Sequence, residues 1–153
     1  MDVTYIQTVK EVIKDVLSQL GFQAECEHEA SATQGDIFHI KCPESSLLIG
    51  RQGANLHALE VLARIISSRR LSIPKISFII DIDDYRLKRD WFLRQTAKAA
   101  AEQAKFSGKI THMEPMASFE RRVVHEFLQE KFPDVTSESE GEGSKRHIVI
   151  KPK

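Results

Sequence analysis

Residues 47–56 read LLIGRQGANL, and within this run Gly50 and Gly53 enclose two polar residues. Glycine adopts backbone conformations that other residues avoid, and it lets a ligand come close to the main chain. A helical pattern follows, so a helix N-terminus points its free N–H groups toward the loop, where they favour a phosphate group. The guanidinium of Arg51 adds a positive charge within reach of a phosphate oxygen. The run therefore predicts a phosphate-binding loop between two helices.

The flanks of this GxxG loop distinguish it from a simple tight turn between helices, which the same pattern also forms. An apolar segment, residues 47–49, precedes it. An amphipathic helix is expected over residues 54–69, with Leu62 on its buried face, and an alternating strand over residues 75–82. No GxxxxGK pattern ending in Ser or Thr is present, which excludes a Walker loop. A Rossmann turn is disfavoured because its glycines would directly follow a strand.

Residues upstream of the loop predict one helix and two strands. Apolar residues recur at helical spacing over residues 5–20, and Gly21 then favours a helix end. Two half-buried strands are expected over residues 22–27 and 36–42, and a short helical turn over residues 45–49. The expected order is therefore helix, strand, strand, short helix, GxxG loop, helix, strand.

The pattern changes in the second half of the chain, where another unit is expected. A long helix is predicted from Asp83 or Asp84, whose side chain would cap it, to about Lys105. A further helix is predicted from about Ser118 to Lys131. Three short strands are predicted over residues 109–112, 135–139 and 147–151. The two units expected are residues 1–82 and 83–153.

The helix predicted over residues 118–131 carries an apolar stripe and, on a different face, two polar residues. Phe119, Val123 and Phe127 are expected at the centre of the buried stripe, with Val124 and Leu128 beside it. Arg121 and His125 are four positions apart, so they are neighbours on a helix and offer several donors to a phosphate or a base. A solvated helix face is the alternative interpretation of this pair.

On these motifs, residues 1–82 resemble a KH domain of the type II, bacterial arrangement. The resemblance implies a GxxG loop that clamps the backbone of about four nucleotides. It assigns that contact to Gly50, Arg51, Gln52 and Gly53, with Asn55 beside them. It also places Ile49 and Leu56 in the apolar floor of the adjoining groove, with membership of the core as the alternative.

Residues from Glu114 onward resemble the carboxy-terminal half of the bacterial Jag family, also called KhpB or SpoIIIJ-associated. That half is an R-three-H domain, named for its Arg-x-x-x-His, which here is Arg121 and His125 with Arg122 between them. The resemblance covers essentially the whole chain. It implies an α+β protein in which a type II KH domain (α-β-β-α-α-β) is joined by a long helix to a small α/β R-three-H domain with a three-stranded sheet. Many members carry a further amino-terminal domain, and this chain is expected to lack it because it starts almost directly at the KH unit.

The same resemblance implies a non-catalytic protein that binds single-stranded RNA, or single-stranded DNA, in post-transcriptional regulation or RNA chaperoning. One alternative is a protein-interaction module that pairs with a small stand-alone KH protein or with a second copy. Another is a nucleic-acid-processing enzyme using His112, His125 or His147. Proton transfer by such an enzyme would require a partnered histidine or carboxylate.

Composition and charge disfavour several classes of protein function. The 22 basic and 22 acidic residues cancel, which disfavours a nucleic-acid binder that relies on charge alone. No apolar run approaches the roughly 20 residues of a membrane helix. Residues 1–10 lack a signal-peptide pattern, so a cytoplasmic protein without a membrane partner is expected.

The two cysteines do not indicate a disulfide framework. A zinc site made of Cys26, His28, His39 and Cys42 is also disfavoured. The first two share one face of a predicted strand, while the other two point to opposite faces. No metal and no cofactor is therefore expected.

Overall fold

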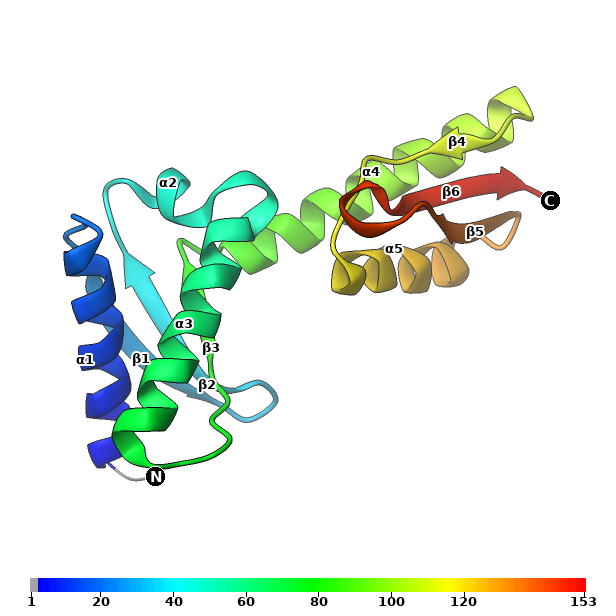
Figure 1. The fold of residues 1–153 in the computed structure, drawn as a ribbon. Coiled ribbons are helices and arrows are strands. Elements are labelled where there is room, and N and C mark those ends of the chain that lie inside the picture. The colour runs from blue at the N-terminus through cyan, green and yellow to red at the C-terminus, as the bar shows by residue number, and fades with distance from the viewer. Residues whose placement is uncertain (1–2) are drawn as a thin grey trace. The chain divides into compact units, whose positions relative to one another are not determined.

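The fold divides between Arg86 and Leu87 into two compact units, each with a hydrophobic core of its own (Figure 1). The computed structural model describes residues 3–153. Both units combine helices with strands, which confirms the predicted α+β class. No helix within residues 3–153 has both the length and the apolar composition that crossing a membrane requires.

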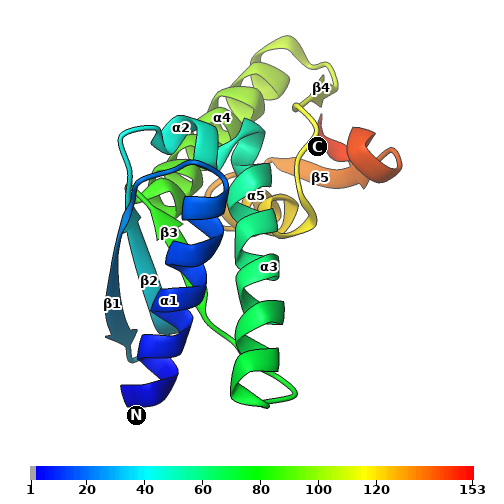
Figure 2. The same cartoon turned by 60° about the vertical axis from the view of Figure 1, so that its left-hand side comes forward.

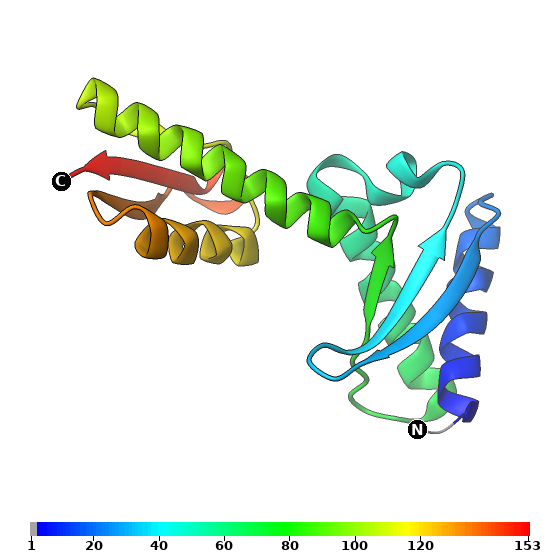
Figure 3. The same ribbon diagram turned by 180° about the vertical axis from the view of Figure 1, so that it is seen from behind.

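The first unit packs two long helices against a three-stranded sheet. Its elements are α1 (Val3–Gln19), β1 (Glu25–Ser31), β2 (Gly35–Lys41), α2 (Ser45–Ile49), the 3-10 turn η1 (Arg51–Gly53), α3 (Ala54–Leu71) and β3 (Ile79–Ile82). The strand order is β1-β2-β3, with β1 antiparallel and β3 parallel to β2. Helices α1 and α3 lie side by side (Figure 2), and no helix of residues 3–86 covers the opposite face of the sheet (Figure 3). This element order is the one predicted from the sequence.

One hydrophobic core joins the helices and the sheet of this unit. Phe38 and Ile40 of β2 and Ile80 of β3 are fully buried, and Ile13 and Leu17 of α1 pack against them from successive turns. Burying one such side chain stabilises the folded state by about 1.5–3 kcal/mol relative to leaving it in water. An exposed ion pair contributes only about 0–1 kcal/mol. The apolar stripe of α1 therefore contributes more to the stability of this unit than its surface charges do.

A buried carboxylate links three parts of the first unit. Glu60 of α3 accepts a hydrogen bond from the Ile80 N–H at 2.9 Å and another from Arg86 Nη2 at 2.6 Å. It also pairs with Arg64 Nη2 at 2.9 Å. A buried charge is strongly destabilising without such partners. Glu60 therefore ties α3 both to β3 and to the last residue of the unit.

The first strand begins later than its apolar alternation predicts. The expected range is 22–27, whereas β1 runs Glu25–Ser31. The Phe22 N–H instead donates to Leu17 O at 2.9 Å, and the Gly21 N–H donates to Ser18 O at 3.0 Å. Together these bonds close α1 in a Schellman motif, so Phe22 is not available to the sheet.

The second unit builds a separate core from two helices and a second three-stranded sheet. Its elements are α4 (Tyr85–Ser107), which begins two residues before the unit boundary, β4 (Thr111–His112), α5 (Ser118–Lys131), β5 (Val135–Glu140), the 3-10 turn η2 (Gly143–Lys145) and β6 (His147–Pro152). The strand order is β4-β6-β5 and both pairings are antiparallel, which confirms the predicted three-stranded sheet. Helix α4 turns a row of small buried residues to this core: Ala97, Ala100, Ala101 and Ala104.

Helix α5 is rotated by one residue from the predicted orientation. Val124 and Leu128, expected beside the stripe, are buried together with Glu120, whereas Phe119, expected at its centre, is 61% exposed. Successive helix positions differ by about 100°, so a shift of one residue changes which side chains face the core. Glu120 is only 1% exposed because Arg89 Nε donates to its Oε1 at 2.7 Å and the Ala117 N–H donates to its Oε2 at 3.1 Å. The apolar pattern alone does not reveal this buried ion pair.

The start of α4 also differs from the prediction. Asp83 and Asp84 have φ angles of 51° and 56°. An N-cap residue has extended backbone instead. The carboxylate that accepts the Arg86 N–H, at 3.2 Å, belongs to Asp81 at the end of the sheet. The chain therefore enters α4 through two left-handed residues.

Candidate nucleic-acid interface

The GxxG loop forms a tight connection between α2 and α3. Gly50, directly after α2, has φ 70° and ψ −178°. Gln52 and Gly53 follow with φ angles of 53° and 78°. The Gly53 N–H donates to Gly50 O at 3.3 Å, which closes the turn. Three of the four loop residues thus have the positive φ that glycine adopts most readily.

Packing explains why both ends of this loop are glycine. A Cβ at Gly50 would lie 2.5 Å from the Asn55 side chain, and one at Gly53 would lie 2.8 Å from the Tyr85 ring. Asn55 is itself fixed, because its Nδ2 donates to Leu47 O at 2.8 Å. Asn55 therefore connects the first turn of α3 to the end of α2 and holds the shape of the loop.

The loop presents donors and one charge to the solvent. Arg51 and Gln52 are exposed, and within residues 3–153 the Arg51 side chain has no hydrogen-bond or ion-pair partner. No side chain caps the N-terminus of α3, an 18-residue helix, at Gly53. The Ala54 N–H donates to Arg51 O within the loop, and the following N–H groups of the first turn have no side-chain cap. Uncapped N–H groups and the helix dipole both favour an anion there. Ile49 is half-buried beside the loop and packs against the core of the unit, whereas Leu56 is a buried member of that core and not part of an open groove floor.

The Arg-x-x-x-His pair lies in the second unit and has partners within the protein. Arg121 Nη1 donates to Met116 O at 2.8 Å. His125 Nδ1 is hydrogen-bonded to Ser137 Oγ, on β5, at 2.7 Å. Burial lowers the pKa of His125 below its ordinary value of 6.5, and the positive charge of Arg121 lowers it further. His125 is therefore a neutral imidazole at pH 7, able to form hydrogen bonds without adding charge.

Arg122 supplies the exposed charge on this helix. It is solvent-exposed, and among the described residues its side chain has no ion pair or hydrogen bond. An arginine without an internal partner loses no existing bond when it contacts a phosphate oxygen. Of the three residues predicted here, Arg122 is therefore best placed for a charged contact, while Arg121 and His125 also support the local structure.

Exposed aromatic residues on α4 and α5 are absent from the set of site residues predicted from sequence. Trp91 and Phe92 are 63% and 52% exposed, and Phe119 on α5 is similarly open. The spacing of the alanines in α4 could have predicted this exposure. The alanines define the buried face of the helix, and residues 91 and 92 lie outside that face.

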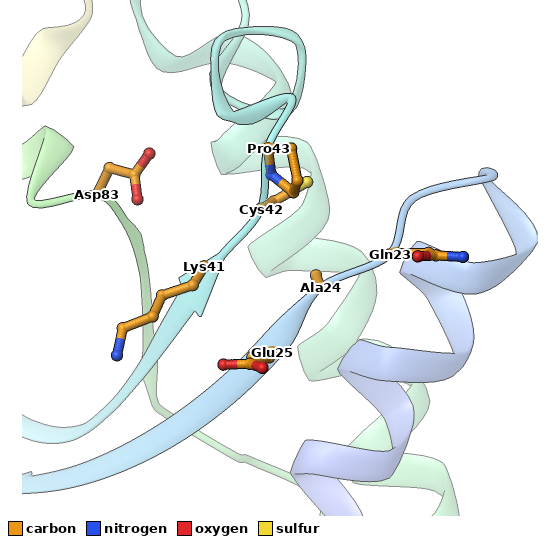
Figure 4. Close-up of a pocket in the computed structure, with 7 residues that line it drawn as sticks. All are labelled: Gln23, Ala24, Glu25, Lys41, Cys42, Pro43 and Asp83. Atoms are coloured by element: carbon orange, nitrogen blue, oxygen red, sulfur yellow. The ribbon is translucent and has the colours of Figure 1, made fainter.

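The open face of the first sheet is acidic and therefore unsuited to a phosphate backbone. Glu27 and Glu29 of β1 lie on it, and each pairs at 3.0 Å with a residue of β2, Glu27 with Lys41 and Glu29 with His39. A pocket of about 590 Å³ adjoins this region, and its lining is shown in Figure 4: Gln23, Ala24, Glu25, Lys41, Cys42, Pro43 and Asp83. The two carboxylates of this lining outnumber its one lysine, so the pocket does not attract an anion.

The two histidines considered for zinc have carboxylate partners. His28 Nε2 is hydrogen-bonded to Asp36 Oδ1 at 2.7 Å, and burial raises the pKa of the Cys26 thiol to about 11. A different trio, His39, Asp81 and Asp84, has ligand atoms within 4.8 Å of one another. Two of its members already have protein partners, since His39 is hydrogen-bonded to Glu29 and Asp81 to the Arg86 backbone.

The chain is similar in sequence to known bacterial proteins over most of its length. The R-three-H domain family matches residues 92–152. The chain is 37% identical over 117 residues to the RNA-binding protein KhpB of Bacillus subtilis, covering 76% of this chain and 56% of that protein. It is 27% identical over 147 residues to KhpB of Lactiplantibacillus plantarum (96% of this chain, 45% of that protein) and 28% identical over 142 residues to KhpB of Clostridium symbiosum (92% and 63%). The chain thus spans about half the length of these relatives.

Proposed function

Because the chain belongs to the Jag/KhpB family, we propose that it binds single-stranded RNA and catalyses no reaction. The observation that carries the proposal is the GxxG loop, where the uncapped N-terminus of α3 and the unpartnered Arg51 side chain are exposed together. The relatives are named RNA-binding proteins, which supports the same ligand. The first unit is, in this proposal, a KH domain of type II.

The loop holds the RNA backbone and the adjoining apolar surface receives the bases. First-turn N–H groups of α3 after Ala54 donate to phosphate oxygens, and Arg51 adds a charge-assisted bond. The glycines allow the backbone of the strand to approach the loop closely, and Ile49 offers an apolar edge beside it. A loop of this kind contacts about four nucleotides.

The second unit contributes a separate contact through α5. Arg122 pairs with a phosphate, and the neutral His125 offers a hydrogen bond without a charge. Two weak sites on one chain strengthen each other through effective concentration when one strand reaches both. Post-transcriptional regulation or RNA chaperoning in the cytoplasm is the role this proposal carries over from the family.

The test is a titration of labelled single-stranded RNA pools at several salt concentrations. Arg51→Asp with Gln52→Asp places negative charge where the phosphate binds, and we expect it to weaken binding by about 10- to 100-fold, the equivalent of one or two charge-assisted hydrogen bonds. Lys75→Asp with Gln34→Asp is the matched control. It changes the net charge equally, at exposed positions beyond the opposite end of the sheet. Equal weakening by both double variants would mean that only net charge matters, and the loop assignment would be wrong.

A single-stranded DNA pool of the same base composition completes this experiment. Stronger binding of RNA would indicate that the 2′-hydroxyls are recognised. Equal binding would leave single-stranded nucleic acid in general as the ligand. Binding of neither pool at low salt would reject the proposed function.

A second candidate function, protein pairing, is favoured by the outer face of α3. Leu62, expected in the buried stripe, is instead exposed, and Val61 and Ile65 are exposed next to it. Apolar side chains grouped in this way are typical of an interaction surface. A small stand-alone KH protein or a second copy of the chain would cover them. Sedimentation of the wild type and of Leu62→Glu over a range of concentrations tests self-pairing, because a monomer at all concentrations would exclude it.

A further inference from the structure

Three aromatic side chains in the second unit are exposed where burial would be expected. Trp91, Phe92 and Phe119 are 63%, 52% and 61% exposed. Large aromatic side chains contribute most to stability when they are buried, so several in one unit that remain open suggest an interaction surface. None of the three belongs to the GxxG loop or to the Arg-x-x-x-His pair.

A single arginine connects the two helices that carry these rings. The Arg89 guanidinium lies over the Phe92 ring, with its Cζ 5.5 Å from the ring centroid. The Nε of the same side chain donates to Glu120 Oε1 at 2.7 Å. Glu120 directly follows Phe119, so Phe92 on α4 and Phe119 on α5 flank one buried ion pair. Trp91 precedes Phe92 on the same helix, where consecutive side chains point about 100° apart, so it extends the exposed aromatic surface around α4.

The charge beside these rings indicates what kind of ligand they fit. Arg122 lies one turn after Phe119 on α5, is exposed, and has no partner among the described residues. Residues 87–153 hold 13 Lys and Arg against 10 Asp and Glu, a net charge of +3, whereas residues 1–86 have a net charge of −3. Exposed rings next to an unpartnered cation, in the cationic half of a neutral protein, match a ligand with flat apolar groups on an anionic backbone.

We infer that Trp91, Phe92 and Phe119 form a stacking platform for the bases of single-stranded RNA, with Arg122 on an adjacent phosphate. This aromatic platform rests on the proposed function and deepens it, because it names how the second unit holds the strand. Stacking tolerates every base, since each has a π face, so the platform adds affinity with little sequence preference.

Trp91 makes the platform directly observable, because it is the only tryptophan of the chain. Oligoadenylate RNA is added to the full chain while Trp91 emission is recorded, and binding of the same labelled oligonucleotide is measured independently by anisotropy. We expect Trp91 emission to be quenched along the same binding curve that the anisotropy reports. Quenching by added iodide should also decrease, because a stacked base shields the ring.

Substitutions give a second measurement with a matched control. Trp91→Ala or Phe119→Ala should weaken binding on the order of 5- to 100-fold, the range found for losing one base–aromatic stack. Phe106→Ala is the control, because Phe106 is 96% exposed on the same helix but lies 15 residues further along. That separation is about 22 Å on an α-helix. The control should bind as the wild type does.

The outcomes separate this inference from the function on which it rests. RNA binding with unchanged Trp91 emission, and with Phe119→Ala as tight as wild type, would overturn the platform and leave the proposed function standing. No RNA binding by the wild type would reject both. A change in Trp91 emission with protein concentration in the absence of RNA would show that the surface is a self-association contact, which would also overturn the platform.

Discussion

Replacing Gly50 by alanine tests whether the loop has the geometry described above. The new Cβ would lie 2.5 Å from Asn55 Cγ and 2.7 Å from its Nδ2, closer than real side chains approach. The backbone at φ 70° and ψ −178° lies in a region that glycine alone adopts readily, and another residue there costs on the order of 1–3 kcal/mol. Displacing Asn55 also breaks its bond to Leu47 O, which contributes about 0.5–1.5 kcal/mol. We therefore expect Gly50→Ala to lower the unfolding free energy of the first unit by about 2–4 kcal/mol.

The matched control is Gly35→Ala in the β1–β2 hairpin. Gly35 also has a positive φ, 78°, but no atom lies within 4 Å of an added Cβ. Only the backbone conformation is penalised there, by about 1–2 kcal/mol. The assay is urea unfolding followed through the amide NMR signals of β2, which report the first unit alone.

The double variant Gly50→Ala with Asn55→Ala separates the clash from the backbone strain. Removing the Asn55 amide clears the space that the new methyl needs, so the double variant should be more stable than the sum of the single effects predicts. Strict additivity, or a Gly50→Ala variant no less stable than Gly35→Ala, would refute the close packing of Asn55 on the loop.

The other predictions concern the second unit. Glu120→Ala leaves the partly buried Arg89 without its carboxylate and should lower the unfolding free energy by about 3–5 kcal/mol in urea melts. The control is Glu126→Ala, at an exposed position of the same helix, which should change the unfolding free energy by less than about 0.5 kcal/mol. The folded-state pKa of His125 is lowered, so the unfolded chain binds a proton first as pH falls below 6.5. The unfolding free energy should therefore decrease as pH falls from 6.5 toward the folded-state pKa, and less steeply in His125→Gln; equal pH profiles would contradict the assigned pKa direction. Arg122→Ala should reduce the slope of log affinity against log salt by about 0.7, the value for one phosphate contact on a single strand, and an unchanged slope would remove Arg122 from the interface.

Residue patterns predicted the order of helices and strands well, because that order follows from local periodicity. The apolar stripe of α1 and the alternation of β2 were visible in sequence, and both elements pack through those side chains. The GxxG segment was predicted as a connection between two helices for the same reason. Positions whose environment depends on neighbouring residues in the chain were therefore within reach of sequence reasoning.

Positions whose environment depends on residues far away in the sequence could not be predicted. Glu120 looks like a surface residue until Arg89, 31 positions earlier, is found beside it, and the frame of α5 was misassigned for that reason. The contact between Gly53 and Tyr85 joins residues 32 positions apart and has no local signal. The limits of β1 depended on how α1 ends, because the Schellman motif uses Phe22.

The packing of Tyr85 on Gly53 has a consequence for dividing the protein into exchangeable parts. Tyr85 and Arg86 belong by sequence to the long helix α4, yet the ring of the first supports the GxxG loop and the guanidinium of the second binds Glu60. A fragment ending at Ile82 would contain every strand of the first sheet and the complete loop but neither of these supports. A recombination event that exchanged the second half of the chain would therefore preserve the first only if its crossover point lay beyond Arg86. The first turn of α4 must therefore be kept together with the GxxG loop, whereas the rest of the helix must be kept together with the R-three-H domain.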